Sequence, residues 1–267
     1  MRRPIVIALV VIVLCAAVAV PLLLIANQPN TLERAVDKAI IFLKNSNEPY
    51  GLLWLDAMHR RFGISEFADS LQRYDQQLAE HPDNEALLRV FRRIADHDNV
   101  LQDGDMQWVV DDYDRLTVPA LYCDRNGLSL NYPTILYTAA STGDYMLTHV
   151  LLALVWIQEN GCESPLPQSY ATSVYSASAV LINSDEVVTD LELEAAAFLY
   201  LAGQDARVDD AFVDHIITTQ NNDGGWRLFS DASEASNWHP TILALFILLH
   251  VKYPADSYPP MLAPASP

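Results

Sequence analysis

The sequence predicts an all-α protein of about five helical hairpins, preceded by one transmembrane helix. Segments after position 30 repeatedly place apolar side chains three and four residues apart, as amphipathic helices do. Three helix starts recur at intervals of 46 residues, at Asp144, Asp190 and Ser236, and a period of this size indicates stacked helical hairpins. The third observation is an N-terminal apolar run whose length suits a bilayer.

The N-terminal run extends over residues 4–26 without a charged side chain. At 1.5 Å per residue, about 23 residues make a helix of roughly 34 Å, which is enough to span a bilayer. Arg2 and Arg3 precede the run, so the positive-inside rule places the N-terminus in the cytoplasm and the residues after Asn27 outside. We therefore predict a single-pass membrane protein with an extracytoplasmic domain, periplasmic or extracellular. A cleaved signal peptide is the alternative, although no good cleavage site ends the run.

Three parts are expected along the chain. Residues 1–30 hold the cytoplasmic tip, the transmembrane signal-anchor and a short linker. Residues 31–253 form the helical domain, and residues 254–267 form a proline-rich tail. The prolines exclude a helix from the tail and predict that it is mobile.

Within the domain, Thr31 is a favourable N-cap for the first helix. A turn is predicted at Pro49-Tyr50-Gly51, and the stretch 96–131, rich in Asp, Gly and aromatic residues, has no assignable pattern. Regular helices resume near Thr134. Helical periodicity predicts the other helices over residues 52–62, 65–79, 85–95, 145–160, 169–183, 187–202, 208–220 and 239–251.

The charge of the domain restricts its partners. All 34 Asp and Glu lie after the N-terminal run, against 14 of the 16 Lys and Arg, so the net charge there is −20. Such a surface repels phosphate backbones, and we expect no nucleic-acid partner. Cys123 and Cys162 are the cysteines outside the run, and their spacing leaves open whether they pair.

Residues 220–226 form a motif, Gln-Asn-Asn-Asp-Gly-Gly-Trp, between two helical patterns. The glycines permit positive φ at little steric cost, so the motif predicts a turn. Its Gln amide can hydrogen-bond loop backbone groups, and its indole can cover the joint. The motif resembles the Q-x-x-D-G-G-W signature of the squalene-cyclase and protein-prenyltransferase superfamily. The resemblance implies a terpenoid-cyclase-like α/α toroid rather than an open solenoid, and it covers residues 134–253 best.

The same resemblance implies a zinc site. Prenyltransferase β subunits hold zinc with an Asp-x-Cys at the start of one inner helix and a His at the start of the next. Asp190 and His239 fall where that Asp and His would lie, and Glu192 stands where the Cys would be. Carboxylates and imidazole ligate zinc, but the thiolate that suits the family's chemistry is missing. The alternative is structural, because Thr189 and Asp190 are good helix caps and a proline follows His239 at a helix start.

Asp111, Asp112 and Asp114 are the candidate catalytic residues. Squalene-hopene cyclases protonate an alkene with a D-x-D-D acid, whereas the order here is D-D-x-D. Paired carboxylates also serve the hydrolysis of glycosidic bonds, one as acid and one as base. A solvated acidic loop is the alternative in so acidic a chain.

No catalytic motif of the resembled superfamily is intact, so the sequence favours a membrane-anchored binding or interaction module. Its predicted ligand-binding residues, near the centre of the toroid, are Trp226, Trp238 and His239. Its partners are the membrane, through residues 4–26, and an unidentified protein or small molecule. His149, on an apolar helix, is expected in the core. The alternatives are an enzyme acting on carbohydrate or cell-envelope polymer through paired carboxylates, and an isoprenoid or prenyltransferase-like metal enzyme.

Overall fold

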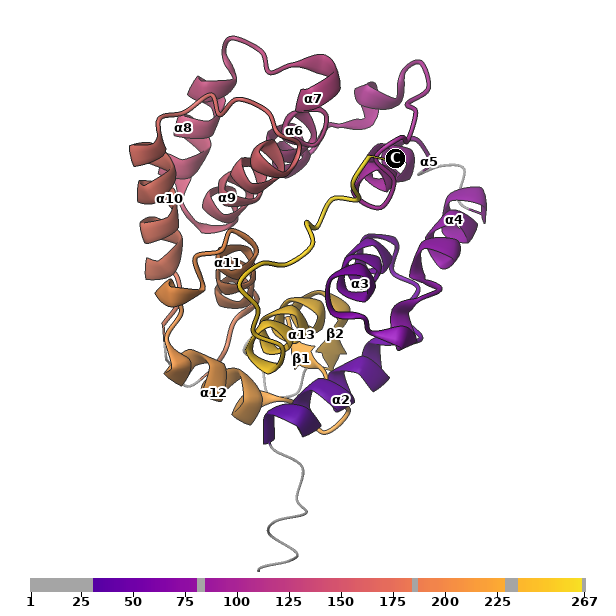
Figure 1. Cartoon of the computed structure of the whole chain (residues 1–267), viewed down its shortest axis with the longest axis vertical. Coiled ribbons are helices and arrows are strands. Elements are labelled where there is room, and N and C mark those ends of the chain that lie inside the picture. The colour runs from indigo at the N-terminus through magenta and orange to yellow at the C-terminus, as the bar shows by residue number, and fades with distance from the viewer. Residues whose placement is uncertain (1–30, 81–84, 184–186, 229–234, 266–267) are drawn as a thin grey trace, which may run out of the picture.

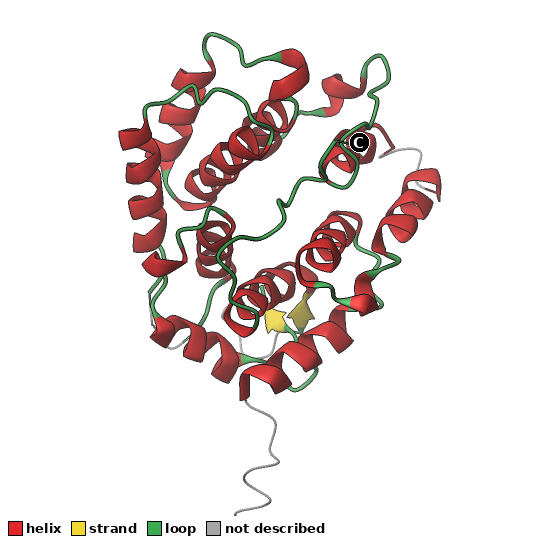
Figure 2. Ribbon diagram, in the orientation of Figure 1, coloured by secondary structure: helices red, strands yellow, loops and turns green. Residues whose placement is uncertain are grey.

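The computed structural model describes residues 31–80, 85–183, 187–228 and 235–265. They are mostly helical, so the predicted all-α class is confirmed (Figure 1, Figure 2). Two strands, β1 (Trp226–Arg227) and β2 (Ser236–Asn237), pair antiparallel. The α-helices are α2 (Thr31–Leu43), α3 (Pro49–Phe62), α4 (Ser70–Glu80), α5 (Glu85–Phe91), α6 (Asp112–Leu121), α7 (Cys123–Asn126), α8 (Tyr132–Thr142), α9 (Asp144–Glu159), α10 (Gln168–Val180), α11 (Asp190–Leu201), α12 (Asp210–Thr219) and α13 (Trp238–Lys252). Short 3₁₀ helices are η1 (Ser65–Phe67), η2 (Arg92–Ile94), η3 (Asp105–Trp108) and η4 (Asp205–Arg207).

The predicted localisation needs correction. Within the described ranges, every helix is too short or too polar to cross a bilayer. The run 4–26, which we predicted to be the anchor, lies outside the described residues. The prediction of a single-pass membrane protein with a cytoplasmic N-terminus and an extracytoplasmic domain is therefore wrong for the part of the chain that the structure describes.

The helices differ in how many of their sides are buried. Residues 240–250 of α13 are all buried, and α9 is buried from Val150 to Ile157. Helix α2, by contrast, buries only a stripe, which consists of Ala35, Val36, Ala39 and Leu43. A helix that is apolar on all sides belongs inside a domain, whereas a one-sided helix belongs at its periphery. Figure 1 agrees, with α3, α9, α11 and α13 toward the centre and α2, α4, α8, α10 and α12 around them.

Contacts between helices join the end of the domain to its beginning. Helix α9 packs against α8, α10 and α11, and α11 packs against α13. Helix α13 also packs against α2 and α3. Gly51, in the first turn of α3, permits the close approach, because a Cβ there would lie 3.1 Å from the side chains of Trp238 and Ile242. Residues 49–51 therefore begin a helix rather than form the predicted turn, since proline suits a first helical turn.

The predicted roles of the motif 220–226 are confirmed. The Gln220 side-chain amide donates to the carbonyl oxygens of Ala35, at 2.8 Å, and Gly224, at 2.9 Å. It thereby links the last hairpin to α2, 185 residues away. The Trp226 ring is buried, and its indole N–H donates to the Ile216 carbonyl at 2.9 Å. The amide thus satisfies the loop carbonyl of Gly224 and reaches the backbone of α2, while the indole covers the joint.

The C-terminal tail lacks a helix, as predicted, but it is held in place. In Figure 1 it crosses in front of the inner helices from α13 toward α5. The Glu159 carboxylate accepts from the backbone N–H groups of Met261, at 2.8 Å, and Leu262, at 3.0 Å. The Arg60 guanidinium donates to the Met261 carbonyl at 2.6 Å. Both apolar side chains are buried, so the expected mobility does not hold for these residues.

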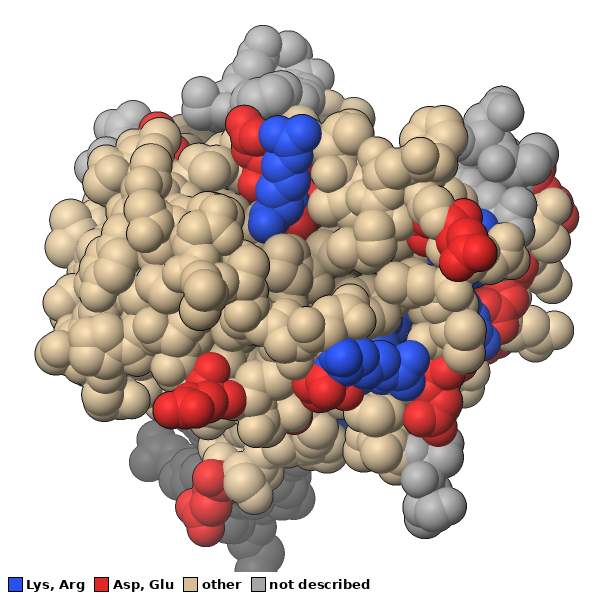
Figure 3. All heavy atoms as spheres, turned by 90° about the horizontal axis from the view of Figure 1, so that it is seen from above, with Lys and Arg blue, Asp and Glu red and all other residues tan. Residues whose placement is uncertain are grey.

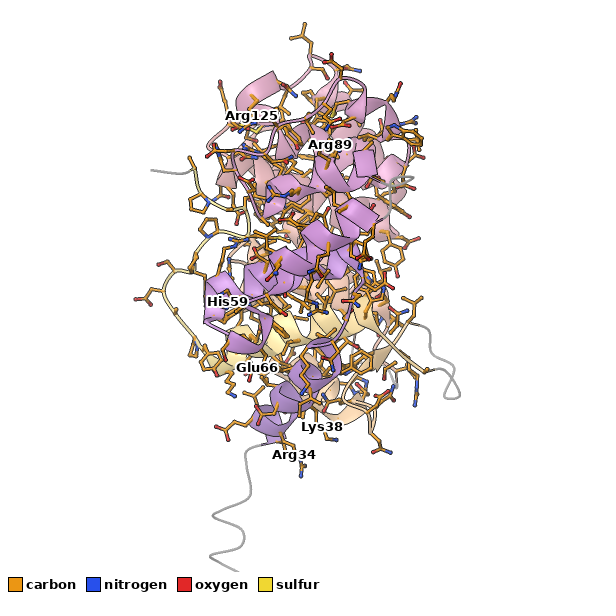
Figure 4. The ribbon with its side chains drawn as sticks, turned by 90° about the vertical axis from the view of Figure 1, so that its right-hand side faces the viewer. Arg34, Lys38, His59, Glu66, Arg89 and Arg125 are labelled. Carbon is orange, nitrogen blue, oxygen red and sulfur yellow. A yellow bond between two sulfur atoms is a disulfide. The ribbon has the colours of Figure 1, made fainter. Side chains whose placement is uncertain are left out.

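The stretch 96–131, left unassigned, contains η3, α6 and α7, and arginines hold its loop. Arg89 donates to both carboxylate oxygens of Asp105, at 2.8 and 2.9 Å, and Arg125 donates to the Asn99 carbonyl at 2.8 Å. Figure 4 places Arg89 and Arg125 at the same end of the molecule, and Figure 3 shows basic side chains beside acidic ones on the face seen from above. Pro119 within α6 explains why periodicity missed that helix.

A disulfide adds a covalent connection to this region. Cys123, at the start of α7, is bonded to Cys162, which follows α9. The sequence left this pairing open. The bond joins two segments separated by 39 residues, and closing such a loop stabilises the folded chain mainly by restricting the unfolded one.

Candidate functional site

The first turns of the inner helices α9, α11 and α13 bring polar side chains together. The Tyr145 hydroxyl of α9 donates to Asp190 of α11 across 2.8 Å, and Asp190 also contacts His239 of α13. Two more side chains, His149 and Glu194, lie one turn further along α9 and α11. His149, Glu194 and His239 follow one another at intervals of 45 residues, so the repeat along the chain brings these three together. We call His149, Asp190, Glu194 and His239 the inner-helix cluster.

Asp190 orients His239. Its carboxylate lies 2.7 Å from Nδ1 of His239, and it is 4% exposed. A carboxylate accepts here, so Nδ1 carries the proton and Nε2 of the neutral ring is left as a base or ligand. Nε2 lies 3.7 Å from Glu194. Asp190 thus serves as the group that fixes the tautomer of His239, with Tyr145 holding the second carboxylate oxygen.

Glu194 lies between the two histidines and is almost fully buried. Its carboxylate accepts from the Thr148 hydroxyl and lies 3.3 Å from Nδ1 of His149. The same Nδ1 is 2.8 Å from the Tyr145 carbonyl oxygen. His149 is therefore satisfied, as the sequence analysis expected of a core residue, but its partners belong to a polar cluster beside the pocket.

Both histidines are biased toward the charged form. Burial by itself lowers the pKa of His239, but the hydrogen bond and charge of Asp190, with the charge of Glu194, outweigh burial and raise it. Burial also lowers the pKa of His149, and the hydrogen bond and charge of Glu194 again raise it overall. Two buried carboxylates without a Lys or Arg partner in the described ranges thus draw positive charge to this site.

Glu192, predicted as the third metal ligand, has a different role. Its carboxylate accepts from the Thr189 backbone N–H at 2.7 Å, and the Thr189 side chain accepts from the Glu192 N–H, which makes a capping box. Glu194, two residues further on, contacts His239 instead. The structure therefore brings Asp190 and His239 together as predicted, with Glu194 beside them and Glu192 at the helix cap.

An aromatic pocket of about 370 Å³ adjoins the cluster. Its lining includes His149, Glu194 and His239, together with Asp111 and Asp114. The volume falls in the range of small-molecule sites. The aromatic lining residues come from α3, α5, α6, α9, α11 and α13, and are Tyr50, Trp54, Phe91, Tyr113, Trp156, Phe198 and Trp238.

The three candidate catalytic aspartates have different environments. Asp111 is the N-cap of α6, where its side chain accepts from the Tyr113 N–H at 2.8 Å. Asp112 is exposed and faces Arg115. Asp114 is half-buried in the pocket, and burial, followed by the charge of Asp111, raises its pKa to about 6, although His149 opposes this. Asp114 is thus the one of the three whose proton affinity suits acid–base chemistry near neutral pH.

Asp114→Asn is expected to change how stability depends on pH. An Asp in the unfolded chain titrates near about 3.9, so the folded state binds this proton more tightly. The resulting stability is fully present below about pH 4 and is lost as pH rises through about 6. As pH rises from 4 to 8, the free energy of unfolding of Asp114→Asn, measured in urea, is therefore expected to increase by on the order of 1 kcal/mol relative to that of the wild type. Asp112→Asn, on the exposed neighbour, is the control, and equal pH profiles of the two variants would contradict the assignment.

The predicted ligand-binding residues do not all meet. Trp238 and His239 line the aromatic pocket, whereas Trp226 lies in the 220–226 joint and is not among the described lining residues. The sequence missed Glu194 and His149, although their 45-residue spacing from each other and from His239 was the available signal.

Family models, curated proteins and solved structures were compared with the chain, and none matches it.

Proposed function

We propose that residues 31–253 form an α/α toroid like that of the squalene-cyclase and protein-prenyltransferase superfamily. The contact of α13 with α2 and α3 supports closure of the ring, as does the bond from Gln220 to the backbone of α2. Inner helices that are buried on all sides alternate along the chain with outer helices such as α2. The 46-residue recurrence corresponds to about five hairpins.

We also propose that the domain is a binding module whose aromatic pocket takes a small, largely apolar ligand without negative charge. The observation that carries this proposal is the composition of the lining, which has seven aromatic rings, three carboxylates and, among the described residues, neither Lys nor Arg. Aromatic walls supply apolar contact area, and a few polar groups orient the ligand. Carboxylates repel phosphate and other anions, which disfavours diphosphate esters and acidic polymers.

Fluorescent probes of different charge test the binding proposal. The neutral probe N-phenyl-1-naphthylamine is expected to bind the full chain with one-to-one stoichiometry, and at least about tenfold more tightly than the anionic 1-anilinonaphthalene-8-sulfonate. Trp238→Ala, in the pocket, should weaken binding of the neutral probe by about tenfold, since it removes an aromatic ring from the pocket lining. Trp108→Ala, half exposed and outside the lining, is the matched control. Equal effects of the two variants would refute the assignment.

A second candidate function is divalent metal binding, the metal-enzyme alternative. Asp190, Glu194 and His239 each offer one ligand atom, and these atoms lie within 4.8 Å of one another. Two carboxylates and an imidazole suit zinc or manganese. The Tyr145 hydroxyl donates to Asp190 and the Thr148 hydroxyl donates to Glu194, so both carboxylates are oriented by hydrogen bonds. The donor set fits a divalent ion, but it lacks the thiolate of the resembled family. A metal bound there would supply Lewis acidity.

Glu194→Gln and Glu192→Gln separate the metal site from the helix cap. If the metal site exists, calorimetric titration of the metal-stripped full chain with Zn²⁺ shows about one equivalent bound. Glu194→Gln then weakens binding by about 10- to 100-fold, because a ligand carboxylate is lost. Glu192→Gln leaves Zn²⁺ affinity unchanged, since its carboxylate serves the capping box. Absence of stoichiometric binding, or equal losses in the two variants, would exclude this candidate.

A further inference from the structure

We infer that the ligand of the aromatic pocket is an organic cation of the quaternary ammonium class, held between aromatic rings and carboxylates. This inference rests on the proposed binding function and specifies its ligand. It differs from the metal candidate, because the cation would occupy the pocket itself and would bind ring faces, which a small hydrated metal ion does not.

The charge of the pocket is the first argument. Asp111, Asp114 and Glu194 line it, and Asp190 contacts the other ring nitrogen of the His239 side chain that Glu194 contacts. The groups in the cluster that can become cationic are two imidazoles. Even with both protonated, fully ionised carboxylates outnumber them by four to two. A negatively charged, partly water-excluded cavity gains free energy when a cation enters it.

The aromatic rings are the second argument, because they select the kind of cation. Trp54 and Phe198 lie parallel with their centroids 6.0 Å apart, and the Tyr113 ring lies 4.5 Å from that of His149. Aromatic faces attract quaternary ammonium groups, and tryptophan attracts them most strongly. A compact ammonium such as Lys keeps its water, whereas a quaternary ammonium has an apolar surface that matches these rings.

A third observation concerns Trp156. This side chain lines the pocket and is 3% exposed, yet its buried indole N–H has no hydrogen-bond partner within the described residues. A buried donor without an acceptor is unfavourable by about 1–3 kcal/mol. A ligand that carries an oxygen acceptor near its cationic group would satisfy it once the Trp156 ring turns its N–H toward the pocket. Choline, which has both a trimethylammonium group and a hydroxyl oxygen, is therefore the simplest probe.

The experiment compares choline with 3,3-dimethylbutan-1-ol, which has the same shape but carbon in place of the charged nitrogen. Calorimetric or NMR titration of the full chain is expected to give choline an affinity at least about tenfold higher. Glu194→Gln and Asp114→Asn should each reduce the ratio of the choline affinity to the affinity for the neutral isostere several-fold, since each removes a carboxylate from the pocket. Asp112→Asn, exposed and outside the lining, should leave it unchanged. Circular dichroism checks that each variant is folded.

The outcomes distinguish this inference from the binding proposal. If N-phenyl-1-naphthylamine binds but choline shows no advantage over its neutral isostere, the ligand is not an organic cation, while the pocket remains a binding site. If the choline preference survives in both carboxylate variants, the charge argument is wrong. If neither choline nor the neutral probe binds, both proposals fail. A choline preference that both carboxylate variants reduce, and that Asp112→Asn retains, supports the inference.

Discussion

Replacing Gly224 with alanine is expected to lower the free energy of unfolding by about 3 kcal/mol or more. Gly224 has φ of 97°, a conformation that residues with a Cβ rarely adopt. A Cβ there would lie 2.4 Å from the carbonyl oxygen of Lys38, and 2.8 Å from its carbonyl carbon. Lys38 lies in α2 (Figure 4), so the clash is with helix backbone that cannot move without displacing the first helix.

Gly63→Ala is the matched control for this prediction. Gly63 also has positive φ, 71°, with ψ of 27° in the left-handed helical region, but a Cβ there would meet nothing within 4 Å. Its replacement therefore measures conformational strain alone, about 1 kcal/mol. Urea unfolding followed by circular dichroism gives both values. Similar losses at the two positions would mean that the 220–226 joint does not lie against α2, which would also remove support for a closed ring.

The double substitution Met261→Ala and Leu262→Ala is expected to destabilise the domain by about 4 kcal/mol. These side chains are 1% and 5% exposed, and the Glu159 carboxylate and Arg60 guanidinium hold their backbone. Truncation therefore leaves space in the core as well as losing apolar burial. Equilibrium urea unfolding at neutral pH measures the change in the denaturation midpoint.

An equally large double truncation at exposed positions serves as the control. Leu130 and Val180 are 102% and 81% exposed, so Leu130→Ala with Val180→Ala should change stability by less than about 0.5 kcal/mol. If the tail were mobile, as its prolines predicted, the two double variants would behave alike. A selective loss from the tail variant instead identifies residues 261–262 as part of the core.

Local sequence signals predicted the helices well where they agreed with packing. Helical periodicity and the capping residue Thr189 located most of the domain's helices, and α2 begins at Thr31, which was predicted to be its N-cap. The signals failed where a proline lies within a helix, as Pro119 does in α6, or begins one, as Pro49 does in α3. In α6 tertiary packing of the helix outweighs the local preference of proline for a break, whereas in α3 proline suits the first helical turn.

The candidate site was predicted only in part, for a geometric reason. Asp190 and His239 were found from their positions at helix starts, and the structure brings them within 2.7 Å. The sequence predicts Glu192, and not Glu194, as a metal ligand, because the Asp-x-Cys spacing of prenyltransferase β subunits falls on residues 190 and 192. Successive helical residues are about 100° apart, so residues 190 and 194 share a face whereas 192 lies on the opposite side.

The amino-acid sequence by itself determined that this protein is helical, that three of its helix starts recur every 46 residues, and that the Gln220 to Trp226 segment forms a joint. These properties depend on periodicity, caps and turn residues, which act over a few neighbouring positions. Only the tertiary structure decided which carboxylate joins the histidines, that the aromatic rings of six helices enclose one pocket, and that the tail is held. Those outcomes depend on the rotation of each helix about its axis and on contacts between distant segments, and both are set by packing.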